Sequence, residues 1–539
     1  MLNHSIKLKT AVRPFLVALL AVCCSGAGLF AQISPESAVN HEHTIDNAAT
    51  TEIAVAGNED SEQNRGVPVR LVSGSSRFRA KARELAEKFS RETRDEALRR
   101  LHGDISFADR PNPEISQEET FQVDKTGGDN KKPLKAVLKV IGRHCYVYLE
   151  KGRRIDEAKL KKVAQMFDQR IYPQTTATFG SEWKPGIDGD PRITLLLLGG
   201  MQGCDGFFYP GDEYTAEKEP GSNEREMLYL STERMGDLND FMGHLVAHEL
   251  QHMIHWHNDA NEMFWVDEAM AEYAATLFER MPWTAEEFFA ASDRNLLDWE
   301  DTRGAENYGH VFLFIDFLLS RPALSDTARV KLVREIVKGK SAGVKGVVEA
   351  MAKVSGKMLF DEIFRDFSAV TFIHNAFKGQ HPYKFSPFVT RNLLKYKQPA
   401  VSPRRTFKTA SGTGKGKVSM WAAAGYEFSL QQQPAKLQLK FSGATSRTAK
   451  GNNAFWLGLA LTDSAGRHAP QLLWLKTAGN RIEKIVNLPP EKKFDRLLLI
   501  VCNQGPMRYR DGDGRLPKVD FEFSLSEEQT RFDSLHEKP

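Results

Sequence analysis

Two histidines and a glutamate in the segment His248-Glu249-Leu250-Gln251-His252 have the residue types and the spacing of a metal-dependent hydrolytic site. In a helix, residues four apart lie one turn above each other, so the imidazoles of His248 and His252 can bind the same ion. Zinc accepts nitrogen and carboxylate ligands tetrahedrally, and a catalytic zinc site uses three protein ligands. Glu249, next to the first ligand, can serve as a general base. The motif therefore predicts two ligands and a base on one helix, and it requires a third ligand from elsewhere.

The residues around this motif support its placement on a helix. The run from Phe241 to Trp256 has apolar residues at helical spacing, which predicts a buried helix. A second helical pattern, Trp265 to Phe278, follows after a short turn and carries Glu268 and Glu272 one turn apart.

The motif pair resembles the hyicolysin-type neutral zinc metallopeptidases, a group of glutamate zincins. The resemblance is carried by HExxH followed by Trp265-Val266-Asp267-Glu268-Ala269, and it extends from about Val137 to His374. Further matching segments are 167–173, 193–198, 206–212, 223–231 and 308–314. The resemblance implies an α+β, zincin-like (thermolysin-like) catalytic domain. Two features depart from the family pattern: Ala269 stands where glycine is expected, and the gap between His252 and Glu268 is short.

The resemblance also implies roles for individual residues. One catalytic zinc ion would be bound by His248, His252 and Glu268, and Glu249 would act as the base toward water at the zinc. Glu272 would accept a hydrogen bond from a ligating imidazole and so orient it. The short gap requires a tight turn over 258–263.

Other histidines near the motif offer alternative metal sites. A metzincin would continue with glycine at 255 and histidine at 258, but the chain has His255 and Asn258 there. His244 lies one turn before His248, yet Leu245 follows it, so no base would be positioned; a packed or hydrogen-bonded helix histidine is the simpler interpretation. His255 and His257 are expected to be solvated, with a supporting or substrate-facing role as alternatives.

Peptide hydrolysis also needs a donor for the oxyanion that develops on the carbonyl. Tyr308 is the candidate, because it opens the apolar helical pattern 308–319 and glutamate zincins often use a tyrosine after the third ligand. A tyrosine that only anchors the start of the helix is the alternative, and His310 is a second candidate donor.

The N-terminus predicts export. Lys7, Lys9 and Arg13 precede an apolar run from Phe15 to Cys23, and small residues follow, so 1–31 reads as a signal peptide. Val22 is too large for a lipobox before Cys23, so lipidation is disfavoured. We expect a secreted, periplasmic or cell-surface protein without a transmembrane segment.

The remaining chain divides into four predicted parts. Residues 32–65 are polar and aperiodic, which predicts a disordered linker. Residues 66–130 contain a charged helix at 77–101 and form an N-terminal region that is a candidate propeptide, with latency as its expected signature. Residues 131–395 form the metallopeptidase domain, with strands at 136–149, 192–198 and 227–231. One of these strands is expected to hold the substrate backbone by strand addition.

Residues 396–539 predict a β-sandwich, because turn residues separate short alternating runs. Its role is open: it could bind substrate, a glycan or a cell surface, or only cover and stabilise the catalytic part. The expected strands are 417–421, 426–430, 436–441, 455–462, 471–476, 496–502 and 519–525.

Charge and cysteine content exclude several classes of function. A net charge of +3 over 539 residues gives no basic patch, so no nucleic-acid partner is expected. Cys145, Cys204 and Cys502 are too few for a disulfide framework or a thiolate zinc site. Acidic Gly-rich loops at 188–190, 205, 212–213 and 511–514 add a calcium hypothesis, although Asp-Gly is first a turn signal.

Together, the residues and the resemblance predict an exported zinc endopeptidase that cleaves protein or peptide substrates. Two alternatives stay open. In one, the β-sandwich is the working domain of a surface-binding protein and the zinc site is only structural, which the intact Glu249 argues against. In the other, the same site hydrolyses a substrate that is not a peptide. The oligomeric state and the cleavage preference are not predicted.

Overall fold

The computed structural model describes residues 79–88, 113–126, 130–299, 304–322, 324–374, 384–444, 454–490, 493–505 and 518–528. These residues belong to one unit of the chain, Gly66–Pro539, and combine helices with three β-sheets, so the predicted α+β class is confirmed. The predicted signal peptide at 1–31, Cys23 and the predicted linker at 32–65 lie outside the described residues.

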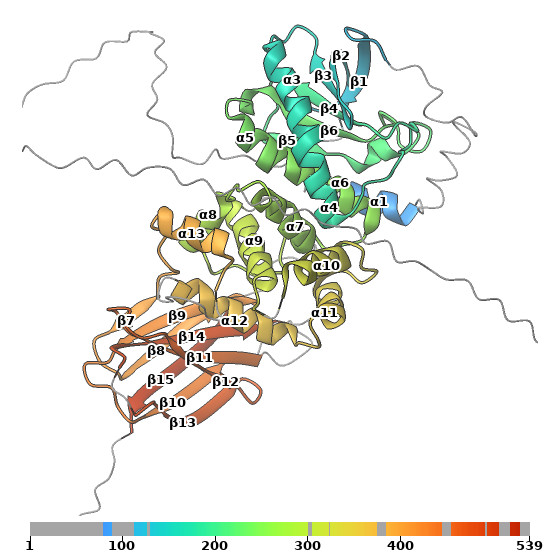
Figure 1. Ribbon diagram of the computed structural model, residues 1–539. Helices are drawn as coiled ribbons and strands as arrows, with labels where there is room; N and C mark the ends of the chain where they lie inside the picture. Colours follow the sequence, from blue (N-terminus) through green and yellow to red (C-terminus); the bar gives the residue numbers. More distant parts are fainter. Residues whose placement is uncertain are drawn as a thin grey trace, which may run out of the picture. The chain divides into compact units, whose positions relative to one another are not determined.

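The strands between residues 118 and 231 form a six-stranded mixed sheet (Figure 1). Its central strand β4, Ile193–Leu198, has all six residues buried, because helices cover one face of the sheet and aromatic side chains cover the other. The strands lie in the order β1-β2-β3-β4-β6-β5; β5 is antiparallel to β6, whereas β3, β4 and β6 are parallel. The other strands are β1 Glu118–Val123, β2 Lys132–Ile141, β3 Cys145–Glu150, β5 Gly206–Phe208 and β6 Met227–Ser231.

The prediction of one strand over 136–149 is wrong, because the segment forms a hairpin of β2 and β3. The turn is held from outside the segment: Asp168 accepts hydrogen bonds from the backbone of Arg143 (2.6 Å) and of His144 (2.7 Å). A carboxylate more than twenty residues away cannot be seen in the local pattern, and the apolar alternation continues on both sides of the turn.

The helix that carries the HExxH motif begins before the motif. Asp237 caps it by accepting from the backbone of Asn239 and Asp240, and the chain then runs through α5 (Leu238–Asp240), the π-helical η6 (Phe241–Val246) and α6 (Ala247–Asn258). π-helical turns within helices are common at functional sites. α6 packs against β5 and against α7, Phe264–Thr276. The earlier helices are α3 Glu157–Met166, η3 Phe167–Ile171 and α4 Tyr172–Phe179.

A second group of helices follows α7. Gly309 allows α9 to approach α8 closely, because a Cβ at this position would lie 1.9 Å from the backbone oxygen of Thr284. The helices are α8 Thr284–Ala290, α9 Ala305–Leu319, α10 Asp326–Val337, α11 Gly343–Val354, α12 Phe360–Ile373 and α13 Pro387–Lys395. None of the helices in the described part of the chain combines the length and the apolar character needed to cross a membrane.

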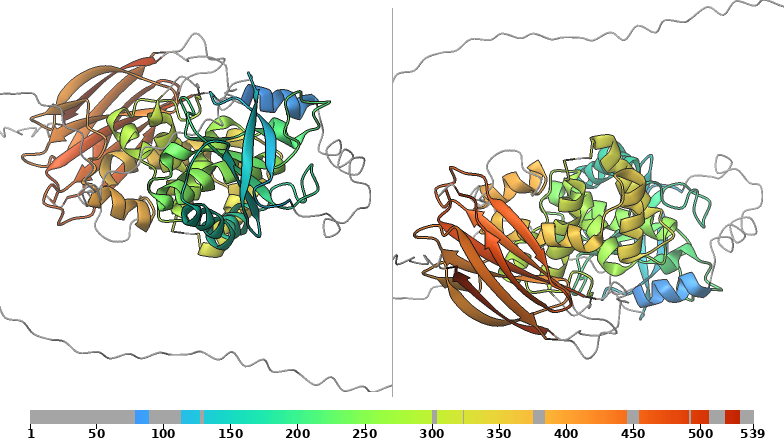
Figure 2. Two further views of the ribbon diagram at one scale, coloured as in Figure 1. Left: turned by 90° about the horizontal axis from the view of Figure 1, so that it is seen from above. Right: turned by 90° about the horizontal axis from the view of Figure 1, so that it is seen from below.

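The C-terminal strands form two stacked sheets (Figure 2). One has the order β13-β10-β15-β8 and the other β12-β11-β14-β9-β7. The predicted strand at 417–421 is wrong, because Ser419–Trp421 is the turn between β8 and β9; β7 and the largely exposed β13 are not predicted. The bounds are β7 Arg405–Phe407, β8 Gly412–Val418, β9 Ala422–Ser429, β10 Lys436–Gly443, β11 Ala454–Thr462, β12 Gln471–Lys476, β13 Arg481–Asn487, β14 Arg496–Gln504 and β15 Val519–Glu527.

Helix α12 joins the helical region to the sandwich. The Phe364 ring meets Trp421 edge to face at 5.3 Å, and Asp361 accepts from the Trp456 indole at 3.1 Å and pairs with Lys476 at 2.8 Å. The contact is therefore a buried aromatic core with a polar rim, and this favours a sandwich that stabilises its neighbour.

We expect Phe364→Ala to lower the free energy of unfolding by about 3–5 kcal/mol, because it leaves a cavity beneath Trp421. Leu359→Ala, at an exposed residue just before the same helix, should change it by less than about 0.5 kcal/mol. Denaturant unfolding of both variants measures the difference. Equal effects would show that the α12 contact contributes nothing specific.

One more prediction meets the structure only in part. Of the helix predicted at 77–101, the structure describes α1, Arg79–Lys88, and the rest lies outside the described residues. α1 packs through the buried Leu85, and Lys81 pairs with Glu219 at 3.0 Å. Cys145, Cys204 and Cys502 are buried and carry free thiols.

Candidate metal site

Three side chains from two helices meet at one point. The Nε2 atoms of His248 and His252 lie 3.0 Å apart, and Glu268 Oε2 lies 3.4 Å from the first and 3.5 Å from the second. A tetrahedral zinc with bonds of about 2.0–2.1 Å needs donors about 3.3 Å apart. The three residues are buried and, across the described ranges, form the one group of three or more His, Cys, Asp or Glu side chains close enough to hold a metal ion. The donor set thus fits a zinc-sized ion.

The turn between the two helices fixes Glu268 relative to the histidines. α6 ends at Asn258 and α7 begins at Phe264, so five residues reverse the chain. Glu262 Oε1 accepts from the backbone of Met263 (2.6 Å) and of Gly343 (2.5 Å), which ties the turn to the start of α11. The tight turn expected from the sequence is therefore built around a buried carboxylate.

Glu272 lies beside the first histidine ligand. Its Oε1 is 3.4 Å from His248 Nδ1, and its Oε2 accepts from Thr284 Oγ1 at 3.0 Å. Although burial raises the pKa of Glu272, contacts with His244 and His248 lower it to about 2. Glu272 is thus an anion placed where it can orient His248. The Nε2 atom of His244 lies 4.0 Å from Glu272 Oε1.

Asp267 is a site residue that the sequence reading missed. Its Oδ2 lies 2.9 Å from His252 Nδ1, and its Oδ1 lies 2.8 Å from His255 Nδ1. The expectation that His255 is solvated is wrong: its side chain is 1% exposed, because it lies one turn after His252 and faces the same carboxylate. The only local signal was the position of Asp267 directly before Glu268.

The buried site contains several carboxylates, which raise the pKa values of its histidines. Burial lowers the pKa of His248, but contacts with Glu268 and Glu272 outweigh it and raise the pKa well above its usual range. Burial likewise lowers the pKa of His252, and Asp267 and Glu268 raise it to about 9. The raised pKa values favour protonated imidazoles when no metal ion is bound. A metal ion must therefore displace these protons to bind. Several buried carboxylates around two imidazoles need a compensating positive charge, which a divalent cation supplies.

We expect Asp267→Ala to weaken zinc binding about 10–100-fold, because His252 loses the partner that fixes its ring orientation. Competition with a chromophoric zinc chelator measures the affinity. Asp259→Ala, on the turn before α7, removes a carboxylate of the same type without touching an imidazole ligand and serves as the control. An unchanged affinity in Asp267→Ala would contradict the orienting role.

The predicted catalytic residues Glu249 and Tyr308 lie on α6 and α9. Glu249 is fully buried in the first turn of α6, directly next to His248. Tyr308 does not open its helix as predicted, because α9 begins at Ala305; its ring meets Trp299 edge to face at 4.7 Å. The roles of both residues in catalysis stay predictions.

His310, the second candidate donor, lies within an aromatic cluster. Its ring stacks on Phe288 at 4.5 Å and on Phe367 at 5.6 Å, and it is 3% exposed. Burial lowers its pKa to about 3, so His310 is a neutral core residue at physiological pH.

This burial predicts a loss of stability in acid. A base whose pKa is lowered in the folded state favours folding above its unfolded pKa of about 6.5, and it disfavours folding as pH falls below that value. At pH 5, protonation of His310 in the unfolded chain should cost about 2 kcal/mol. His310→Leu should reduce the stability difference between pH 7.5 and pH 5 by this amount in urea unfolding. An unchanged difference would show that His310 does not cause the acid sensitivity.

The acidic loops bind protein groups. Asp212 accepts from Tyr229 at 2.5 Å and pairs with Lys131 at 3.2 Å, and Asp205 pairs with Arg234 at 2.7 Å. Asp190 accepts from Tyr146 at 2.6 Å. Among the described residues, these acidic loops contain no group of three side chains close enough to hold a calcium ion. Residues 511–514 lie outside the described residues.

No protein-family model and no curated protein matches the chain. Among solved structures, aminopeptidase A of Legionella pneumophila in complex with aspartic acid is similar with a TM-score of 0.32 and 12% identity, over 69% of this chain and 36% of that enzyme. Tripeptidyl peptidase 2 has a TM-score of 0.16 and 9% identity, over 23% and 10% of the chains. A family GH115 4-O-methyl-α-glucuronidase has a TM-score of 0.15 and 9% identity, over 64% and 53%. Likenesses this low carry no inference about function, which has to come from the site.

Proposed function

We propose that the protein is an exported zinc-dependent endopeptidase with a thermolysin-like catalytic domain. The observation that carries the proposal is the separation of 3.0–3.5 Å between three buried donors, His248 Nε2, His252 Nε2 and Glu268 Oε2. A bound zinc ion would supply Lewis-acid polarisation of a substrate carbonyl and lower the pKa of water.

The protein's own groups would handle the protons. Glu249 takes a proton from the attacking water on its carboxylate and passes it to the nitrogen of the leaving amine. Asp267 and Glu272 hold the imidazoles of His252 and His248 in orientation through their Nδ1 atoms. Tyr308 is the proposed donor to the oxyanion. A site with only a structural metal would have no use for a buried carboxylate at position 249.

Strand β5 is the proposed substrate strand. It stands at the end of the six-stranded sheet and packs against α6, with Leu245 3.1 Å from where a Cβ of Gly206 would lie. An extended peptide that adds to β5 would pass along the helix that carries the motif. A backbone held in this way favours cleavage within a chain.

Cleavage of reduced casein by the purified mature chain tests the proposal. We expect cleavage that 1,10-phenanthroline abolishes and that added zinc restores. The N-terminal region is removed in a parallel sample, so that latency does not hide activity. If zinc-loaded protein without this region cleaves no protein substrate, the proposal is wrong. Either a surface-binding role or hydrolysis of a different bond would then take its place.

A further inference from the structure

The outer face of the four-stranded sheet is the second feature of the molecule that could bind a ligand. In β10 and β15 the rings of Phe441 and Phe523 point into the sandwich and are buried. Lys440 and Glu522, which alternate with them, are exposed on the outer face. In β8 glycine stands at three of the four inward positions; a Cβ at Gly414 would lie 2.4 Å from the Phe523 ring. The outer face therefore presents charged groups and hydroxyls.

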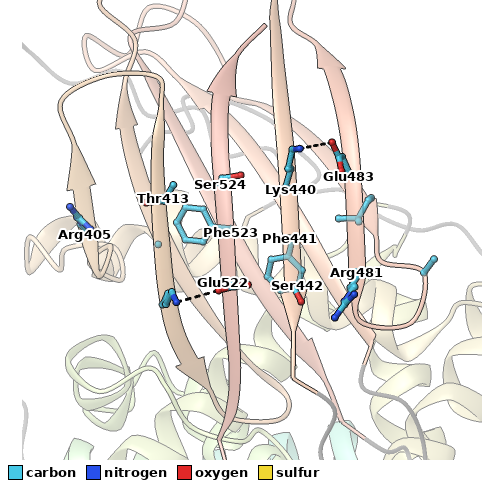
Figure 3. A pocket seen from close by; sticks show the side chains of 14 residues that line it. Arg405, Thr413, Lys440, Phe441, Ser442, Arg481, Glu483, Glu522, Phe523 and Ser524 are labelled. Atoms are coloured by element: carbon cyan, nitrogen blue, oxygen red, sulfur yellow. Dashed lines mark ion pairs between the residues drawn. The ribbon is translucent and has the colours of Figure 1, made fainter.

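This face is hollowed. A depression of about 1260 Å³ crosses all four strands (Figure 3). A second depression of about 650 Å³ shares Lys415, Ser442, Arg481 and Glu522 with it, so that the two form one open groove. Because the groove is open, a polymer bound in it could continue beyond it.

The charges in the groove are unevenly balanced. Four basic side chains and two carboxylates line the larger depression. Lys415 pairs with Glu522 at 3.4 Å, and Lys440 with Glu483 at 2.8 Å, which neutralises both carboxylates.

Two arginines in the groove remain without a carboxylate. Arg405 and Arg481 are exposed, and within the described ranges neither has a carboxylate at ion-pair distance. Figure 3 shows the two on opposite sides of the groove. A guanidinium binds a carboxylate with two parallel hydrogen bonds, so the groove has two anion-binding groups, Arg481 on β13 of the four-stranded sheet and Arg405 on β7 of the five-stranded sheet.

We propose that this groove binds an acidic polysaccharide, with uronate carboxylates at Arg405 and Arg481. The hydroxyls of Thr413, Ser442 and Ser524, which also line the groove, would bond the sugar hydroxyls. The two aromatic rings in the lining are turned inward, so recognition rests on charge and hydrogen bonds, which favours a charged glycan over a neutral one. A concave face suits a flexible chain better than a flat membrane. The proposal does not depend on the peptidase activity.

Binding to polygalacturonate tests the proposal, with the full chain immobilised and binding measured at 50 and 150 mM NaCl. We expect saturable binding that weakens with salt, and no binding of neutral dextran. Arg405→Gln/Arg481→Gln should weaken binding about tenfold or more, because two charge-assisted contacts are lost. Arg143→Gln/Arg154→Gln removes two exposed arginines far from the sandwich in sequence and should stay within about twofold of wild type.

Other results would overturn the proposal. These are no binding of polygalacturonate at 50 mM NaCl, an equal effect of the two double variants, or binding only of dextran sulfate or of phosphatidylserine vesicles. Unfolding midpoints of both variants should equal that of wild type, because all four arginines are exposed. Binding should be unchanged in Glu249→Ala, which separates this test from that of the peptidase.

Discussion

Glu249→Gln should lower the rate of peptide hydrolysis about 10³-fold or more and leave zinc bound. The substitution keeps the size of the side chain and removes only its ability to accept and return a proton, and general base catalysis contributes about 10²–10⁴-fold. Glu249 is fully buried next to His248, so a carboxylate on the protein surface cannot take over its role as the base. The measurement is kcat on a quenched fluorescent peptide, together with zinc content by atomic emission.

A matched substitution separates this effect from general damage. Glu182→Gln also changes a buried glutamate, 2% exposed and bonded to the Tyr172 hydroxyl at 2.7 Å, but outside the metal site. It should retain near wild-type kcat. If Glu249→Gln keeps substantial activity with zinc bound, the proposed proton transfer is wrong. If it loses zinc as well, the role of Glu249 is to hold the site together.

The two histidines of the candidate metal site could be predicted because their positions follow from helix geometry. The spacing of His248 and His252 places them one turn apart on a helix, whereas Glu268 was assigned from the family resemblance, and the structure brings all three together. Strand β4 was predicted for a similar reason: five of its six residues are apolar and all six are buried. Local periodicity is enough where a single element sets the geometry.

Contacts between elements could not be predicted in this way. Asp267 reaches His252 and His255 only because α7 crosses α6 at a particular angle, and an aspartate next to a ligand has no distinctive pattern. The hairpin of β2 and β3 depends on Asp168, in η3. Strand β13 was missed because most of its side chains are exposed on the groove face, so its apolar alternation is weak.

Glu268→Gln should lose zinc far more completely than Glu272→Gln, although the two glutamates lie one turn apart on the same helix. Glu268 Oε2 is within 3.4–3.5 Å of both ligand nitrogens, so its charge is part of the proposed coordination. Of the two histidines of the site, Glu272 contacts only His248, at the Nδ1 atom, and orienting carboxylates contribute about 10–100-fold to metal affinity. We expect Glu268→Gln to exceed this range and to abolish cleavage.

The stability of the metal-free forms shows that the loss is not unfolding. In the metal-free protein Glu268, 0% exposed, lies beside the imidazoles of His248 and His252 and raises their pKa values, so Glu268→Gln should lower the stability of the metal-free protein but leave it folded. Zinc should then raise the unfolding midpoint of wild type and of Glu272→Gln but not that of Glu268→Gln. Equal stabilisation of all three by zinc would mean that the ion binds without Glu268, and the proposed ligand set would be wrong.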